Sequence, residues 1–114
     1  DYTNTFCNLM GINSDEVYKN NDFITWKNVW KKRSELNNST KEKQLKLMGE
    51  NNPTVIPRNH KVEEALAEAV KGNLDKMKKL LIILKKPYDN QNNIKEYQVP
   101  SPLGNEKYQT FCGT

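Results

Sequence analysis

Few side chains in this chain could do chemistry, and their types and spacing match no catalytic motif. The 114 residues include one histidine and two cysteines. A nucleophile paired with a histidine base would have to use His60, for which capping and packing at a helix start is the simpler interpretation. The neighbouring carboxylates of Glu63 and Glu64 would point about 100° apart on a helix, and acidic residues at a helix start already favour its positive end. We therefore expect no catalytic residue in this chain.

The cysteines and glycines also exclude the common metal and nucleotide sites. Cys7 and Cys112 lie near opposite ends of the chain without CxxC spacing, and two cysteines with one histidine leave a tetrahedral zinc site one ligand short. No two glycines are close enough for a GxGxxG or Walker loop. We therefore expect no cofactor in this chain. Cys112 lies three residues from the chain end, where it could reach a second thiol, so it is our redox candidate; the alternative is an inert tail cysteine.

The composition fits one small domain with no clear partner. The formal charge is +4, from 18 basic and 14 acidic residues. All basic residues except Arg33 and Arg58 are lysines, which cannot make the bidentate contacts that nucleic-acid readout favours, so we expect no nucleic-acid partner. The apolar run at 80–84 is far shorter than the roughly 20 residues of a membrane span, so we expect a cytoplasmic protein without membrane contact. Because the chain begins with Asp1, we expect a fragment.

The elements that must position these residues are helices. Before residue 87 apolar residues recur at intervals of three and four positions, which predicts an all-α protein of about five helices. The apolar faces comprise Tyr2, Phe6 and Leu9; Phe23, Trp26 and Trp30; Leu45 and Met48; Val62, Leu66, Ala69 and Val70; and Met77, Leu80, Leu81 and Leu84. We expect the aromatic residues among them to hold helices together rather than to bind a ligand.

Capping residues predict where these helices begin and end. The predicted signals are Gly11 after the first helix, an N-cap at Asp22, a capping box of Ser39 and Glu42, an end before Pro53, an N-cap at Asn59, an end at Gly72, and Asp75 as cap or first-turn acid.

We predict a helical domain over residues 1–87, with a helical hairpin near 60–86, and an extended tail over 88–114. The helical spacing stops at Pro87, and the tail carries isolated aromatic residues that are hard to leave in water. We expect the tail to lie along a surface and to insert its rings into it.

Several strings resemble the C-terminal region of the selenoprotein O family. The most specific is NPTVIPRNH at residues 52–60. The others are VEEAL at 62–66, Leu80, Leu81 and Leu84, Pro87 with Tyr88, YQTFCGT at 108–114, DYTNTF at 1–6, and the pair Trp26 and Trp30. The resemblance covers nearly the whole chain.

The resemblance implies a parent enzyme with a pseudokinase fold. Members of the family are protein adenylyltransferases that bind ATP with Mg or Mn and transfer AMP to Ser, Thr or Tyr of target proteins. Their nucleotide-binding and catalytic residues precede the region that matches Asp1, so none has an equivalent here. Cys112 matches the family's terminal redox position, whose partner thiol would lie in the kinase-like part.

We therefore interpret the chain as a structural and regulatory C-terminal piece of a bacterial adenylyltransferase. Its expected partners are the N-terminal kinase-like domain of the same protein and the parent's protein substrates. Candidate docking residues are Arg58, His60, Tyr108 and Phe111. The alternative is a free-standing helical module whose lysines, at positions 76, 78, 79, 85 and 86, bind an acidic partner.

Overall fold

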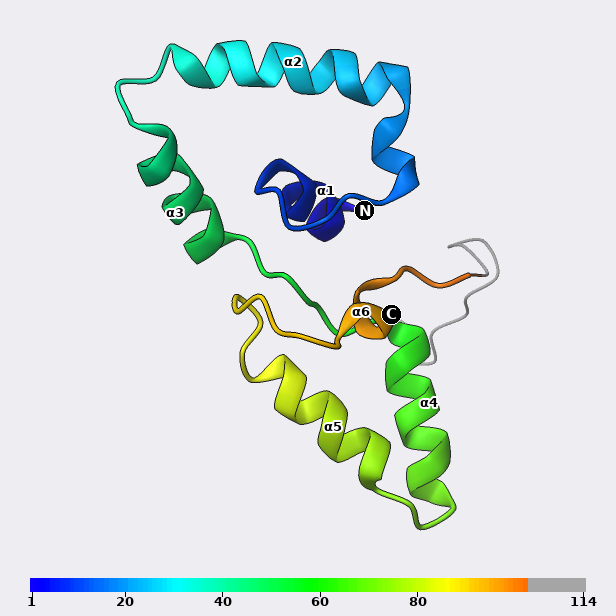
Figure 1. Ribbon diagram of the computed structural model, residues 1–114. Helices are drawn as coiled ribbons and strands as arrows, with labels where there is room; N and C mark the ends of the chain where they lie inside the picture. The colour runs from blue at the N-terminus through cyan, green and yellow to red at the C-terminus, as the bar shows by residue number, and fades with distance from the viewer. Residues whose placement is uncertain (103–114) are drawn as a thin grey trace, which may run out of the picture. The chain divides into compact units, whose positions relative to one another are not determined.

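The computed structural model describes residues 1–102 and is helical throughout its regular elements (Figure 1). Among these residues there is no strand, which confirms the all-α class. The elements are α1 (Tyr2–Leu9), η1 (Glu16–Lys19), α2 (Asn21–Glu35), α3 (Lys41–Asn51), α4 (Asn59–Val70), α5 (Asp75–Leu84) and α6 (Lys95–Gln98). None of these helices is long and apolar enough to cross a membrane. The candidate residues Tyr108, Phe111 and Cys112 lie outside the described residues.

The chain divides into two compact units, residues 1–53 (unit 1) and residues 54–114 (unit 2). This division differs from the boundary at residue 87 that the helical spacing predicts. The reason is that the segment after Pro87 contains the short helix α6, and its side chains Ile94 and Tyr97 are buried with those of the preceding helices. Residues 88–102 therefore belong with α4 and α5.

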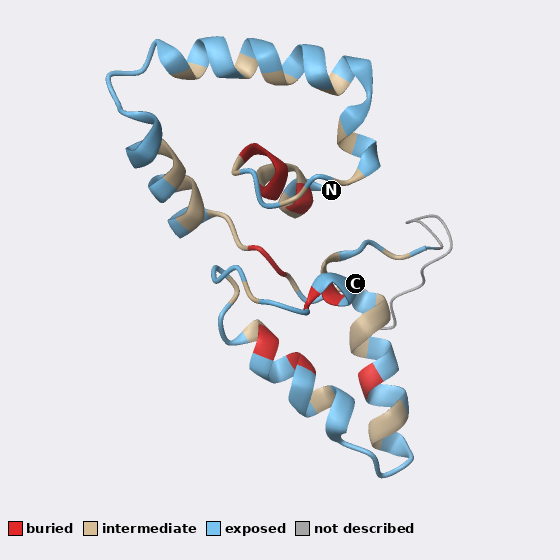
Figure 2. Ribbon diagram, viewed as in Figure 1, coloured by how far each residue is buried: buried red, intermediate tan, exposed pale blue. Residues whose placement is uncertain are grey.

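The core of unit 2 lies where α4, α5 and α6 meet (Figure 2). Its buried residues are Val55, Ala65, Leu80, Ile83, Ile94 and Tyr97, and Val62, Met77 and Leu84 pack against them. α4 and α5 run in opposite directions on either side of a turn at Gly72, whose φ of 90° is the left-handed geometry that favours glycine (Figure 1).

The spacing predicts three residues in this core that the structure places at the surface, so the prediction is wrong for them. Leu66, Val70 and Leu81 are exposed, Val70 to 89%. On both helices the buried face is rotated away from them, towards Ala65 on α4 and Ile83 on α5. Neighbouring apolar residues point in different directions, because each residue turns a helix by about 100°. When several of them follow one another, the spacing does not decide which ones face the core.

The buried residues of the helices of unit 1 all lie on α1. The Asp1 carboxylate caps this helix by accepting from the backbone N–H of Asn4 at 3.2 Å. Cys7 is buried, and its thiol donates to the carbonyl of Pro53 at 3.9 Å. The chain leaves the helix through Gly11, which has a φ of 82°, as the sequence predicts.

α2 and α3 carry no buried residue. The Phe23 ring lies 5.0 Å from that of Tyr18 and 5.6 Å from that of Trp26, yet Trp26 remains 49% exposed. The expectation that this aromatic face holds helices together is therefore wrong for Trp26, whose ring contact is with its own helix.

Two of the predicted N-caps are also wrong. α2 begins two residues earlier than predicted, because Asn20 is the N-cap: its Oδ1 accepts from the N–H of Asp22 at 2.8 Å, which leaves Asp22 in the first turn. α4 begins at Asn59 itself, so that Arg58 takes the N-cap position without a side-chain hydrogen bond.

The capping box is displaced by one position. Thr40, not Ser39, caps α3, and its hydroxyl accepts from the N–H of Lys43 at 3.3 Å. Glu42 therefore lies one position too early to complete a box. Asp75 is the first-turn acid of α5, as predicted.

Thr54 connects the start of unit 2 to the segment after α5 through hydrogen bonds. Its N–H donates to the carbonyl of Pro87 at 2.7 Å, and its hydroxyl lies 2.7 Å from the carbonyl of Asp89 and 3.2 Å from that of Pro87. Only 1% of Thr54 is exposed, so its hydroxyl has little access to water and depends on these acceptors.

We predict that Thr54→Val lowers the free energy of unfolding by about 0.5–1.5 kcal/mol, because valine keeps the shape of the side chain but loses the hydrogen bonds of the hydroxyl to two backbone carbonyls. Urea unfolding followed by circular dichroism measures this. The matched control is Thr25→Val on the exposed surface of α2. Equal effects of the two substitutions would contradict the assigned role of Thr54.

Candidate docking site in unit 2

Arg58, one of the candidate docking residues, is half-buried at the start of α4. Its Nη2 donates to the carbonyl of Gln98 at 3.0 Å, and the Gln98 side-chain amide donates to the carbonyl of Thr54 at 2.8 Å. These bonds join two residues of the NPTVIPRNH segment, Thr54 and Arg58, to the end of α6. Arg58 therefore has an internal structural contact, and its role in docking stays a prediction.

His60 lies in the first turn of α4 and is half-buried. Its side chain makes no hydrogen bond to another described residue, so the capping role that we considered simplest has no support in residues 1–102. His60 is close in sequence to a charged cluster that begins one residue later, at Lys61. Its docking role likewise stays a prediction.

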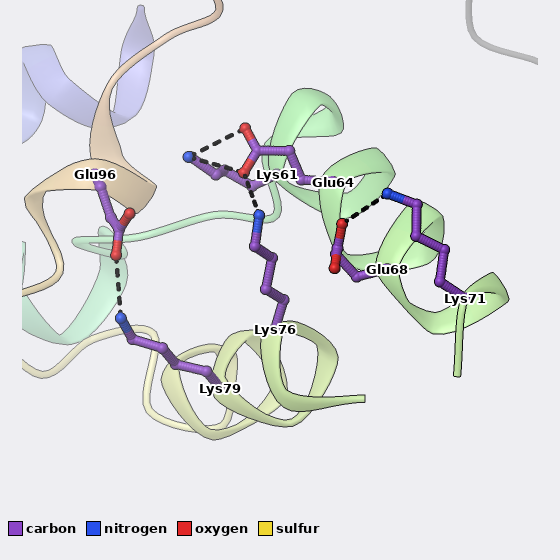
Figure 3. A network of polar contacts seen from close by, with 7 residues as sticks. All are labelled: Lys61, Glu64, Glu68, Lys71, Lys76, Lys79 and Glu96. Atoms are coloured by element: carbon purple, nitrogen blue, oxygen red, sulfur yellow. Dashed lines mark hydrogen bonds and ion pairs between the residues drawn. The ribbon is translucent and has the colours of Figure 1, made fainter. Parts of the chain in front are cut away.

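This charged cluster joins α4, α5 and α6 (Figure 3). Glu64 pairs with two lysines. Lys61 Nζ donates to its Oε2 at 3.2 Å, and Lys76 Nζ forms a looser ion pair with the same oxygen at 3.8 Å. Lys79 on α5 lies 3.1 Å from Glu96 on α6. The cluster therefore links three helices through ion pairs.

Tyr97 forms the apolar floor of the cluster. Its ring is buried, with Lys79 Nζ 5.3 Å and Lys61 Nζ 6.0 Å from the ring centroid. Cations at this range are attracted to the negative face of an aromatic ring. A small cavity of about 180 Å³ lies here, lined by Tyr97 and the five charged residues of the cluster.

The electrostatics of the cluster indicate fixed charges rather than proton transfer. The hydrogen bond from Lys79 holds the pKa of Glu96 below its ordinary value. The same bond, with the nearby Tyr97, raises the pKa of Lys79. Both residues are therefore charged near neutral pH, and neither is tuned as an acid or base. Within residues 1–102 no group of three or more His, Cys, Asp or Glu residues is placed to hold a metal ion.

The sequence does not predict this cluster. Lys76 and Lys79 have a predicted role only in the lysine group that would bind an acidic partner, and Glu96 and Tyr97 have none. Only the i,i+3 spacing of Lys61 and Glu64 gives a local signal. The remaining candidates, Tyr108, Phe111 and Cys112, lie outside the described residues.

We predict that the Glu96 carboxyl titrates below the ordinary range of a glutamate. A lowered folded-state pKa means that its ion pair stabilises the fold above the ordinary glutamate pKa, and that this stabilisation is lost as the pH falls through the lowered value. Lys79→Gln should raise the pKa of Glu96 in a carbon-13 NMR titration at low salt. Lys71→Gln, which removes the same charge from the separate pair with Glu68, should leave it unchanged; an equal shift would show that only net charge matters.

Known proteins match this chain over its whole length. Proteins named protein nucleotidyltransferase YdiU from Pelagibacter ubique, Clostridium botulinum and Bacillus mycoides are 52%, 48% and 43% identical to it. Each match covers 100% of this chain but 24% of the relative, so the chain spans about a quarter of their length. No family model and no solved structure matches. The family resemblance is thereby confirmed: the chain is a homologue, over its whole length, of one part of the YdiU protein nucleotidyltransferases of the selenoprotein O family.

Proposed function

We propose that this chain is the C-terminal scaffold and regulatory portion of a bacterial, cytoplasmic protein adenylyltransferase. The parent would transfer AMP from ATP to Ser, Thr or Tyr hydroxyls of target proteins. The observation that carries the proposal is the 52% identity over the entire chain to a protein named as a nucleotidyltransferase, of which the chain spans 24%. The remaining length of such a parent leaves room for the kinase-like part that the family resemblance implies.

The exposed apolar side chains of unit 1 support the scaffold role. Trp26, Val29 and Leu47 are large apolar side chains that are exposed, and the helices that carry them have no buried residue. Apolar surface of this kind is typical of contacts with another protein surface. In our proposal the kinase-like part of the same polypeptide covers these faces of α2 and α3.

We place the nucleotide and its Mg or Mn in the kinase-like part. The sequence has no glycine-rich phosphate loop, and the charged cluster of unit 2 pairs its lysines with Glu64 and Glu96 rather than leaving them to bind phosphate. This chain would then pack against the catalytic part and make no contact with ATP.

Isothermal titration calorimetry tests whether the ATP site lies outside this chain. ATP with magnesium should give no saturable heat with the 114-residue chain, whereas the longer polypeptide that contains it should bind ATP and label a protein substrate with AMP. Saturable binding of ATP to the 114-residue chain would contradict the placement of the site. A longer polypeptide without AMP transfer would contradict the parent activity.

An acidic partner for the lysine-rich hairpin is the alternative function. Of the five lysines in that patch, Lys76 and Lys79 already pair with carboxylates of this chain. Lys78, Lys85 and Lys86 make no ion pair within residues 1–102. Because part of the charge is neutralised internally, the geometry favours the scaffold role.

We propose a redox role for Cys112, with Tyr108 and Phe111 docking the tail near the catalytic part. Two thiols, that of Cys112 and one in the kinase-like part, would lose two electrons and two protons to form a disulfide, while an external disulfide such as oxidised glutathione is reduced to two thiols. The bond would hold the tail against the catalytic part and change its activity.

We predict that oxidised glutathione changes AMP transfer by the longer polypeptide and that Cys112→Ser removes this response. Time courses of AMP incorporation at a series of glutathione redox ratios measure the effect. The control is Cys7→Ala, because Cys7 is buried and should not respond. Unchanged redox sensitivity in Cys112→Ser would refute the role.

A further inference from the structure

A groove of about 560 Å³ lies within unit 1, separate from the charged cluster of unit 2. Its size is in the range of about 300–1,000 Å³ that is typical of binding pockets, and is larger than a single ion needs. Three lysines and three apolar side chains are prominent in its lining: Lys27, Lys31 and Lys41, with Trp30, Leu45 and Met48.

Among residues 1–102 the lysines of the groove have no carboxylate partner. Lys27 Nζ donates to Asn8 Oδ1 at 2.6 Å and to the Asn8 carbonyl at 3.3 Å, both neutral acceptors. Lys31 and Lys41 make no ion pair within residues 1–102. Glu35 is the one acidic residue in the lining, so three positive charges against one negative charge leave the groove at +2.

This arrangement contrasts with that of unit 2. There each lysine of the cavity forms an ion pair with Glu64 or Glu96, and three positive charges against two negative charges leave +1. In unit 1, partial burial and the nearby charge of Lys31 lower the pKa of Lys27, and its acceptors among the described residues are the neutral oxygens of Asn8. A carboxylate brought into the groove would reverse that imbalance.

We propose that this groove binds an acidic segment of a partner protein. A carboxylate of the segment contacts Lys27 and Lys31, and an apolar side chain next to it packs on Trp30, Leu45 and Met48. A lone phosphate would leave the apolar side chains uncovered, and nucleic-acid readout would favour arginine, which the lining lacks. The binding site does not depend on the proposed function, since it uses only unit 1 residues of this chain.

The test uses the 114-residue chain and two capped hexapeptides, acetyl-ALEELA-amide and acetyl-ALQQLA-amide, which differ only in the carboxylates. Binding is followed by NMR at the two indole N–H signals, since Trp30 lines the groove and Trp26 does not. We expect the glutamate peptide to shift the Trp30 signal and to bind about tenfold more tightly than the glutamine peptide, as a charge-assisted contact implies. Added salt should weaken the binding of the glutamate peptide and leave that of the glutamine peptide unchanged.

Lys31→Gln should weaken the binding of the glutamate peptide about tenfold. Lys27→Gln provides a second variant. Lys31 is the preferred variant because it makes no internal hydrogen bond among the described residues. The control is Lys32→Gln, an exposed lysine on the same helix outside the groove, which should bind as the unmodified chain does. Circular dichroism verifies that each variant retains its helices.

Four results would overturn the proposal: equal binding of both peptides, equal weakening by Lys32→Gln, displacement of the peptide by inorganic phosphate at similar concentration, or loss of peptide binding in the longer polypeptide. The last result would mean that the parent fills the groove with its own residues. Since none of these measurements uses ATP or AMP transfer, failure here is distinguishable from failure of the proposed function.

Discussion

Unit 2 depends on the buried hydrogen bonds of Thr54. A two-helix hairpin has only one apolar face to bury and is marginal by itself, so α4 and α5 need a third element. Thr54 supplies the geometry for it, because its bonds to the carbonyls of Pro87 and Asp89 fix where the chain goes after α5. That path brings Ile94 and Tyr97 into the core. The charged cluster exists only as a consequence, since Lys79 and Glu96 meet across this closure.

The helical class and the approximate extents of five helices could be predicted from spacing, since three- and four-residue periodicity is local information. The ends were less accurate for a physical reason. Asn20 and Asp22 are both good N-caps, as are Ser39 and Thr40, and their preferences differ by only a fraction of a kcal/mol. Which of two neighbouring caps is used then depends on the path of the preceding chain, and the residues themselves do not record that path.

The short helix α6 and the site around it could not be predicted in the same way. α6 has four residues and no side-chain cap, so it carries no periodic signal of its own. Its position follows from contacts distant in sequence, such as that of Arg58 with Gln98. An ion pair such as that of Lys79 with Glu96 is equally invisible to local spacing, because each residue alone resembles an ordinary solvated charge. Local rules therefore find the helices but not the site that their packing creates.

The two units bury their apolar residues to different degrees, and this difference bears on how the chain works. Unit 2 has a contiguous core, whereas in unit 1 the buried apolar residues Cys7 and Leu9 both lie on α1. Helices as short as α2 and α3 gain little stability from backbone propensity alone, and most helices in proteins are stabilised by packing of an apolar face. The exposed faces of α2 and α3 are therefore where additional packing would stabilise this chain most. The groove of unit 1 is lined by residues of both helices, so a ligand bound there, as we propose, would supply part of that packing.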